Sequence, residues 1–400
     1  MTSYKLCTFG GMAQNVTRYA PVSAGDGSTS WKATEAPVEE IVGSAGTFKN
    51  LYVEVTALAS GQTATFTLRV NGADTALTLT ITGTTTTGSD TTHTVTVAAG
   101  DIVSLKAVTS ATSGGTGQIR VSMDYTGDTA NESLLMGRED APTADGYCGV
   151  DGWTDIDAAT FTVAKQLIAT AGTVKKFYVR LDTAPGVGST NTFTVYKNGS
   201  ATALTITVSN LDVTGNDTSN SFTVAAGDKL AIFKDESAVA ANTAFCWGMV
   251  FAATTDGEFP IVAGTGADPS NAATNYNTLT VMNDCAWDTT EDFRWNAGRA
   301  SWITNMYVEC TTAPGAGNSY TYTLRNNAAD TALSVAIAEA ATTGNDTEAS
   351  GVAIANFDNL SVSSVPVSTP TQPAEISYGF TVTMTNPAPD TFTPTSSWFL

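Results

Sequence analysis

Positive charge, histidine and long apolar runs are all scarce in this chain of 400 residues. Lys and Arg together number 18 against 38 acidic residues, which gives a net charge of −20. Because clusters of Lys and Arg hold a phosphate backbone, we expect no nucleic-acid partner. The same deficit disfavours docking on anionic membranes. The sequence contains no run of about 18 apolar residues, so no transmembrane helix is predicted.

Few residues are suited to acid–base or metal chemistry. His93 is the only histidine, and its counterparts in the repeat described below are Asn220 and Ala349. A Ser-His-Asp or Cys-His site is therefore not expected, and His93 is interpreted as a surface residue. No C-x-x-C pair occurs, so we expect free buried thiols, with a Cys148–Cys246 bridge as the alternative. The five cysteines are Cys7, Cys148, Cys246, Cys285 and Cys310.

Paired carboxylates are the catalytic option that remains, because glycoside hydrolysis uses two of them. The candidates are Glu39-Glu40, Glu139-Asp140 and Glu291-Asp292. We interpret them as solvated charges in segments between strands. A protein that is not an enzyme is therefore expected, and a glycosidase is the weakest of the functional hypotheses.

Length and composition indicate a folded protein of several domains. A domain usually spans roughly 100–200 residues, so 400 residues predict two to four of them. The apolar fraction of 42% is ordinary, whereas the charged fraction of 14% lies below the usual ~25%. Residues 1–14 carry one basic residue, Lys5, and no apolar run, so a secretory signal peptide is not expected.

An internal repeat is the strongest feature of the sequence. Residues 66–72 recur at 193–199 and 322–328, and the nearby Thr75, Thr202 and Thr331 are 127 and 129 residues apart. Three more blocks recur in the same order, which predicts three copies of one unit. These blocks are 46–53, 172–179 and 303–308; 87–90, 214–217 and 343–346; 98–101, 225–228 and 355–358. The predicted domains are residues 1–128, 129–257 and 258–400.

Each copy has the pattern of short strands. Apolar and polar residues alternate over 51–55, 66–70 and 77–81, and the abundant Thr favours a pleated surface. Asn71-Gly72 and Asn198-Gly199 lie between alternating runs and predict tight hairpin turns, since both positions need positive φ. The third copy has Asn327-Ala328, for which we expect a looser loop.

These signals predict an all-β protein of three tandem β-sandwich modules. About eight to ten strands in a unit of ~127 residues fit a jelly roll better than an immunoglobulin sandwich, which has about seven. The connections near 126–130 and 253–258 are short, so we expect the modules to stack as a semi-rigid rod.

Two sets of residues are candidate binding sites. Asp90, Asp217 and Asp346 recur within T-G-[SN]-D and could supply carboxylates to calcium, whereas an Asx-type turn is the simpler interpretation. Calcium is the one cofactor considered. Trp31, Trp153 and Trp287 each follow the first strand of their copy, and could stack on a sugar ring or belong to the core.

The pattern G-T-[FV]-K-[NK]-[LF]-Y-V, then F-T-[LV]-x-x-N-G, then A-A-G-D resembles β-sandwich modules of bacteriophage virion proteins, such as decoration, fibre and tail components. The resemblance implies a non-enzymatic structural protein of a virion surface, made in the host cytoplasm and freed by lysis. We further hypothesise self-association, as trimers or as a lattice through the uncharged β faces, and contacts with other virion proteins. The alternative function is an extracellular carbohydrate-binding adhesin that uses the three Trp residues on surface glycans.

Overall fold

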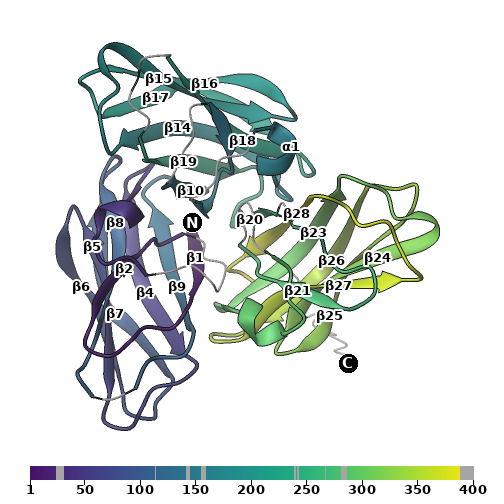
Figure 1. Ribbon diagram of the computed structural model, residues 1–400, viewed down its shortest axis with the longest axis horizontal. Coiled ribbons are helices and arrows are strands. Elements are labelled where there is room, and N and C mark those ends of the chain that lie inside the picture. The colour runs from purple at the N-terminus through teal and green to yellow at the C-terminus, as the bar shows by residue number, and fades with distance from the viewer. Residues whose placement is uncertain are drawn as a thin grey trace, which may run out of the picture.

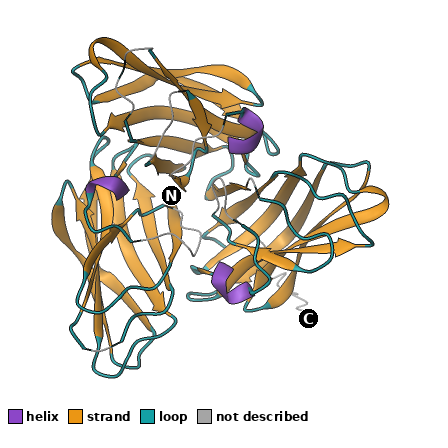
Figure 2. Cartoon of the chain, viewed as in Figure 1, coloured by secondary structure: helices purple, strands orange, loops and turns teal. Residues whose placement is uncertain are grey.

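The computed structural model describes residues 1–23, 31–112, 114–140, 145–154, 159–237, 240, 243–265, 267–280 and 286–387, without the side chains of 153, 154 and 265. Three successive sandwiches of two facing sheets make up this part of the chain (Figure 1). Three short turns are the helical structure that Figure 2 colours purple: η1 (Ala36–Val38), α1 (Phe161–Ala164) and η2 (Glu291–Arg294). The predicted fold class, all-β with three tandem sandwich modules, is confirmed.

In module 1 the sheet β1-β9-β4-β7 faces the sheet β2-β8-β5-β6, to which the short β3 adds at β8. The strands of the first sheet are β1 (Thr2–Phe9), β9 (Ile119–Gly127), β4 (Gly46–Val55) and β7 (Thr87–Val97). Those of the second are β2 (Thr17–Ala20), β8 (Ile102–Thr109), β5 (Thr63–Val70), β6 (Ala73–Thr82) and β3 (Glu40–Ile41).

Module 2 repeats this order as β12-β10-β19-β14-β17 facing β11-β18-β15-β16, with β13 at β18. Its pairs are antiparallel except for β10 with β12. The strands of the first sheet are β10 (Glu132–Glu139), β12 (Gly152–Thr154), β19 (Phe245–Ala253), β14 (Gly172–Leu181) and β17 (Thr214–Val224). Those of the second are β11 (Gly146–Cys148), β18 (Lys229–Glu236), β15 (Gly186–Lys197), β16 (Ser200–Asn210) and β13 (Gln166–Leu167).

Module 3 has the order β20-β28-β23-β26 facing β21-β27-β24-β25, with β22 at β27. The first sheet contains β20 (Glu258–Thr265), β28 (Ile376–Thr383), β23 (Ser301–Cys310) and β26 (Thr343–Ile354). The second contains β21 (Asn275–Asn277), β27 (Asn359–Val367), β24 (Gly315–Asn326), β25 (Ala329–Glu339) and β22 (Asn296–Ala297). Eight principal strands that alternate between two four-stranded sheets in this way form a jelly roll.

The outer hairpins show why these residues form half-buried strands. In β6, Leu77, Leu79 and Ile81 point into the core, while Thr78 and Thr80 face outward. The outward threonines pair with threonines of β5 through hydroxyl hydrogen bonds, as Thr80 does with Thr65 at 2.8 Å. Alternation of this kind gives one apolar face for the core and one polar, uncharged face.

The hairpin turn has the same backbone in all three copies. Asn71, Asn198 and Asn327 each have φ 51°, and the residues that follow have φ 76°, 79° and 60°. The third of these residues is Ala328, so the expectation of a looser loop is wrong. The strand pairing on both sides imposes the turn even though a Cβ disfavours the left-handed region.

The three modules form a closed ring around a central axis, with the N-terminus near its centre (Figure 1). The short strand of each module contacts the first sheet of another: β3 contacts β10, β14 and β19; β13 contacts β20, β23 and β28; β22 contacts β1, β4 and β9. We name these interfaces junction 1–2, junction 2–3 and junction 3–1. The expected semi-rigid rod is therefore wrong, because module 3 packs back onto module 1.

Ring closure buries strands on both of their faces. Strands β10 and β28 are buried at every residue, whereas the outer strand β6 alternates between buried and exposed residues. First-strand residues also join the core of the preceding module around the ring. Leu134 and Met136 pack in the core of module 1, Val262 in that of module 2, and Tyr4 and Leu6 in that of module 3. The jelly rolls therefore share their hydrophobic cores across the junctions.

Candidate functional site: the junctions between modules

At two junctions the backbone of one module lies directly on the sheet of the next. A Cβ on Gly248 would stand 2.1 Å from the carbonyl oxygen of Ile41, and a Cβ on Gly379 would stand 2.2 Å from that of Leu167. Side chains cannot occupy such gaps, so glycine is required for this approach. Ser122 occupies the corresponding place at junction 3–1, where it is fully buried.

One buried polar side chain per module holds the loop that precedes it. Glu40, Gln166 and Asn296 occupy equivalent places at the start of β3, β13 and β22, and all are fully buried. Glu40 accepts hydrogen bonds from the amides of Val22 (2.7 Å) and Ser23 (3.0 Å). Gln166 and Asn296 accept equivalent bonds from loop amides of their own modules. Because unpaired buried amides are costly, these acceptors fix the loops near the axis.

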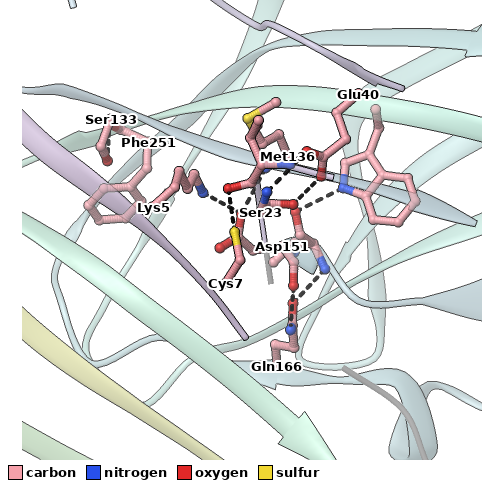
Figure 3. A network of polar contacts seen from close by, with 12 residues as sticks. Lys5, Cys7, Ser23, Glu40, Ser133, Met136, Asp151, Gln166 and Phe251 are labelled. Atoms are coloured by element: carbon pink, nitrogen blue, oxygen red, sulfur yellow. Dashed lines mark hydrogen bonds and ion pairs between the residues drawn. The ribbon is translucent and has the colours of Figure 1, made fainter. Parts of the chain in front are cut away.

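The polar network around Lys5 joins modules 1 and 2. Lys5 from β1 donates to Asp151 Oδ1 at 2.5 Å, and the same oxygen accepts the amide of Met136 from β10 at 2.9 Å. Figure 3 shows this ion pair beside Gln166, whose side chain bonds the backbone of Asp151 on both its donor and acceptor sides. The loop of module 2 is thereby fixed to the first strand of the chain.

Glu40 differs from its two counterparts because it can ionise. Burial raises the pKa of Glu40 from 4.5 to about 7, since its hydrogen bonds with Ser23 and Val22 and the charge of Lys5 only partly offset the lost hydration. The amide side chains of Gln166 and Asn296 carry no such charge. Module 1 therefore contains a loop support whose charge changes near neutral pH.

The residue before each of these three side chains makes a different contact at each junction. Glu39 pairs with Arg180 at 2.5 Å, Lys165 pairs with Glu309 at 2.5 Å, and Trp295 lies 5.0 Å from the guanidinium of Arg120. The charges of the first two pairs are reversed. If the modules were arranged in another order, side chains of like charge would meet at these places. The contacts therefore specify which modules are neighbours.

Asp90, Asp217 and Asp346 lie in β7, β17 and β26, where backbone amides use their carboxylate oxygens. Asp90 accepts bonds from the amides of Thr78, Thr92 and His93, and Asp217 and Asp346 accept comparable ones. Burial opposes ionisation of Asp90, but the hydrogen bonds from His93 and these amides lower its pKa to about 2. Bonds from the carboxylate to the backbone amides just after it are those that an Asx-type turn makes. Among the described residues, no group of three or more His, Cys, Asp or Glu could hold a metal ion.

The other polar candidates take structural positions. The His93 ring is 54% exposed and its Nδ1 lies 2.9 Å from Asp90. Glu40 and Glu139 are fully buried in β3 and β10, so the interpretation of these two as solvated loop charges is wrong. Glu291 forms an ion pair with Arg325. Cys7, Cys148, Cys246 and Cys310 are buried and are not joined to one another by disulfides, and Cys285 lies outside the described residues.

Two of the three candidate Trp residues pack at the edges of their modules. The Trp31 ring lies 4.9 Å from Phe9 and donates its indole N–H to the Gly10 carbonyl. Trp287 contacts Tyr322 and Tyr378, with ring centroids 6.2 and 6.3 Å away. Both are half-buried against the core. Trp153 belongs to β12, and its side chain lies outside the described residues.

No known family model matches the chain, and no curated protein has a matching sequence. None of the helices in the described part of the chain has the length and hydropathy of a membrane-spanning segment.

The role of these residues at the junctions was missed in the sequence, where Glu40 was considered only as part of a carboxylate pair, because their types differ between copies. Glu40, Gln166 and Asn296 share a place and a role, but no alignment by residue identity groups them. The available signal is positional, since Glu40 and Gln166 both lie six residues before the first Gly of a repeated block. A buried hydrogen-bond acceptor at this position in one copy therefore predicts another acceptor at the equivalent position of the next copy.

Proposed function

We propose that this protein is a non-enzymatic structural component of a virion surface, and that one chain supplies a complete block of three jelly rolls. The observation that carries the proposal is the cyclic contact of β3, β13 and β22 with the following module. Head-to-tail interfaces that close make a finished ring, whereas open ones make filaments. Jelly rolls recur in viral capsid domains, and also in lectin domains and cupins.

The outer hairpins support assembly with further proteins. Their outward faces carry rows of threonine, such as Thr78 and Thr80 in β6 and Thr205 and Thr207 in β16. A polar face without charge can meet a like face without repulsion, even in a chain of net charge −20. In this proposal the partners are further copies of the chain and other virion proteins, and synthesis takes place in the host cytoplasm.

Electron microscopy of purified particles tests the proposal. An antibody against a tag on the chain should label intact particles in a regular pattern, and the tagged protein should copurify with them through a density gradient. Particles without label, in a preparation whose lysate contains the tagged protein, would end the virion hypothesis.

The structure weakens the adhesin hypothesis at two of the three residues on which it was based. Trp31 and Trp287 pack against the cores of their modules and are half-buried, which makes them poor platforms for a sugar ring. A glycan array with the Trp31→Ala and Trp287→Ala variants distinguishes the two functions. Binding that is lost in both variants, with folding intact, would favour the adhesin.

A further inference from the structure

An open cavity of about 360 Å³ lies at junction 2–3. Module 2 contributes Gly227 and Lys229 to its wall, and module 3 contributes Tyr307, Glu309 and Asn345. Small-molecule sites in proteins commonly measure roughly 300–1,000 Å³, lie between domains and combine an apolar surface with a few polar groups. The cavity has all of these properties.

The corresponding place at junction 3–1 is filled by a side chain of the protein. Phe357 occupies the position of Gly227 in the same turn, with φ 69° against 92° for the glycine. The amide of each donates to the segment after β22 or β13, at 2.9 Å for Phe357 and 2.7 Å for Gly227. The Phe357 ring packs on Tyr52, with centroids 5.2 Å apart. Tyr52 has the same place in β4 as Tyr307 has in β23.

A second side chain covers Tyr52 and is also absent at junction 2–3. The Arg299 guanidinium lies 4.0 Å from the centroid of the Tyr52 ring, whereas the equivalent residue in module 2 is Ala169. Tyr52 is consequently only 9% exposed, while Tyr307 is half-buried. The chain thus seats one six-membered ring on Tyr52 and leaves room for another on Tyr307.

The wall around Tyr307 carries both donors and acceptors. Glu309 bonds Lys229 at 2.9 Å and Lys165 at 2.5 Å. Burial opposes ionisation of Glu309, but the two lysines outweigh it and lower its pKa. The carboxylate is therefore charged at neutral pH. Asn345 is exposed and pairs with Tyr307 across the neighbouring strand β26, so its amide stands at the same edge.

We propose that this cavity binds a pyranose ring of a saccharide. The C–H face of the sugar packs on Tyr307, as Phe357 packs on Tyr52, and its hydroxyls bond Glu309, Lys229 and Asn345. A ligand with an unsubstituted aromatic ring would fit the cavity less well. It would remove these polar groups from water without giving them hydrogen-bond partners, which is unfavourable. The proposal concerns the cavity alone and does not depend on whether the protein belongs to a virion.

Saturation-transfer NMR on the full chain tests the proposal, with the methyl glycosides of glucose, galactose and mannose, and with N-acetylglucosamine. At least one should bind saturably, and Tyr307→Ala should raise its Kd at least tenfold. Asn345→Ala, a change at an exposed residue, should raise it several-fold. Gly227→Phe, which copies the side chain at 357, should abolish binding.

The matched controls lie at junction 1–2. Tyr178→Ala and Gly100→Phe alter the equivalent tyrosine and glycine there and should leave the Kd unchanged, because Ile102 and Arg180 stand at the places of Lys229 and Glu309 and the polar wall is different. Thermal unfolding establishes that every variant is folded. Absence of binding by the whole panel overturns the proposal, as does binding that Gly227→Phe and Asn345→Ala both leave unchanged. N-acetylphenylalanine amide provides the last check, because tighter binding of this phenyl compound would reject the pyranose assignment.

Discussion

Junctions 1–2 and 2–3 are accompanied by short covalent connections, whereas module 3 meets module 1 without one. Residues 128–131 join β9 to β10, and residues 254–257 join β19 to β20. A short connection keeps its two modules at a high effective concentration, so moderate contacts suffice. Junction 3–1 closes a much longer loop and must be held by its own contacts.

The contacts at junction 3–1 agree with this requirement. Arg299 forms a two-pronged ion pair with Asp124, at 2.8 and 2.7 Å, and both side chains are buried. The equivalent pairs are Gly43 with Val250 at junction 1–2 and Ala169 with Thr381 at junction 2–3, neither of which is charged. Two-pronged Arg–carboxylate pairs are directional as well as strong. The junction without a connection therefore has the most specific bonding.

Asp124→Val should give the largest effect, because it copies the residue at 250 and leaves the Arg299 charge buried without its partner. Removal of one member of a buried ion pair costs about 3–5 kcal/mol. Urea unfolding should show that loss, and small-angle scattering should show a larger radius as the ring opens.

The matched comparison for this variant is Glu39→Ala at junction 1–2. Its partner Arg180 is 31% exposed, so the cost should be about 1 kcal/mol or less. The double variant Asp124→Val, Arg299→Ala should recover part of the loss because no buried charge remains. Equal losses in Asp124→Val and Glu39→Ala would contradict the distinction between the junctions.

Glu40→Gln should change the pH dependence of stability at junction 1–2. The pKa of Glu40 is raised from 4.5 to about 7 by folding, so the folded state binds its proton more tightly than the unfolded state. The stabilisation from protonated Glu40 is complete below pH 4.5 and is lost as the pH rises to about 7. Over about 2.5 pH units this amounts to roughly 3 kcal/mol.

The Gln variant copies Gln166 and should be the more stable protein at pH 8, with little difference at pH 4.5. Urea unfolding across this range, with Gln166→Ala as a variant that should show no new pH dependence, provides the measurement. Parallel curves for the wild type and Glu40→Gln would show that Glu40 does not control the pH response.

Gly248→Ala tests the close backbone approach at junction 1–2. The added Cβ would stand 2.1 Å from the carbonyl oxygen of Ile41, so the segments must separate, at a cost of about 1–3 kcal/mol. Ser122→Gly, at the equivalent place in junction 3–1, should have a smaller effect. Thermal unfolding of both variants would reveal the difference, and a harmless Gly248→Ala would show that the segments are not in close contact.

The strands and the jelly-roll class followed from the sequence because they depend on local patterns. Alternation in β6 and the Asn71-Gly72 turn are properties of a few neighbouring residues, and three copies repeat them. The ring could not be predicted in the same way. Its contacts join residues as distant as Tyr52 and Asn356, and their types change from junction to junction.

The candidate sites were predicted less well for a related reason. Residues that recur, such as Asp90 and Asp217, serve the common fold by bonding backbone amides. Residues that distinguish the copies, such as Phe357 in place of Gly227, lie at the junctions. The positions at which the three copies differ, rather than those at which they agree, therefore indicate the residues of the junctions.

Two residues at which the third copy differs from the others allow the effect of a junction contact to be distinguished from that of backbone strain. Ala328 and Phe357 both have positive φ, 60° and 69°, where the other copies have glycine. Ala328 lies in an outer hairpin, so Ala328→Gly should only relieve strain and stabilise the protein by about 1 kcal/mol. Gly72→Ala should cost a similar amount, since a Cβ there meets no atom within 4 Å and the backbone conformation alone opposes it.

Phe357→Gly relieves the same kind of strain but removes the ring that packs on Tyr52. The stability lost with the ring should exceed the stability gained by relieving the backbone strain, because truncation of a packed aromatic side chain usually costs more than one strained residue. The two variants should therefore shift the melting temperature in opposite directions, Ala328→Gly upward and Phe357→Gly downward. Upward shifts in both would mean that Phe357 contributes nothing to closing the ring.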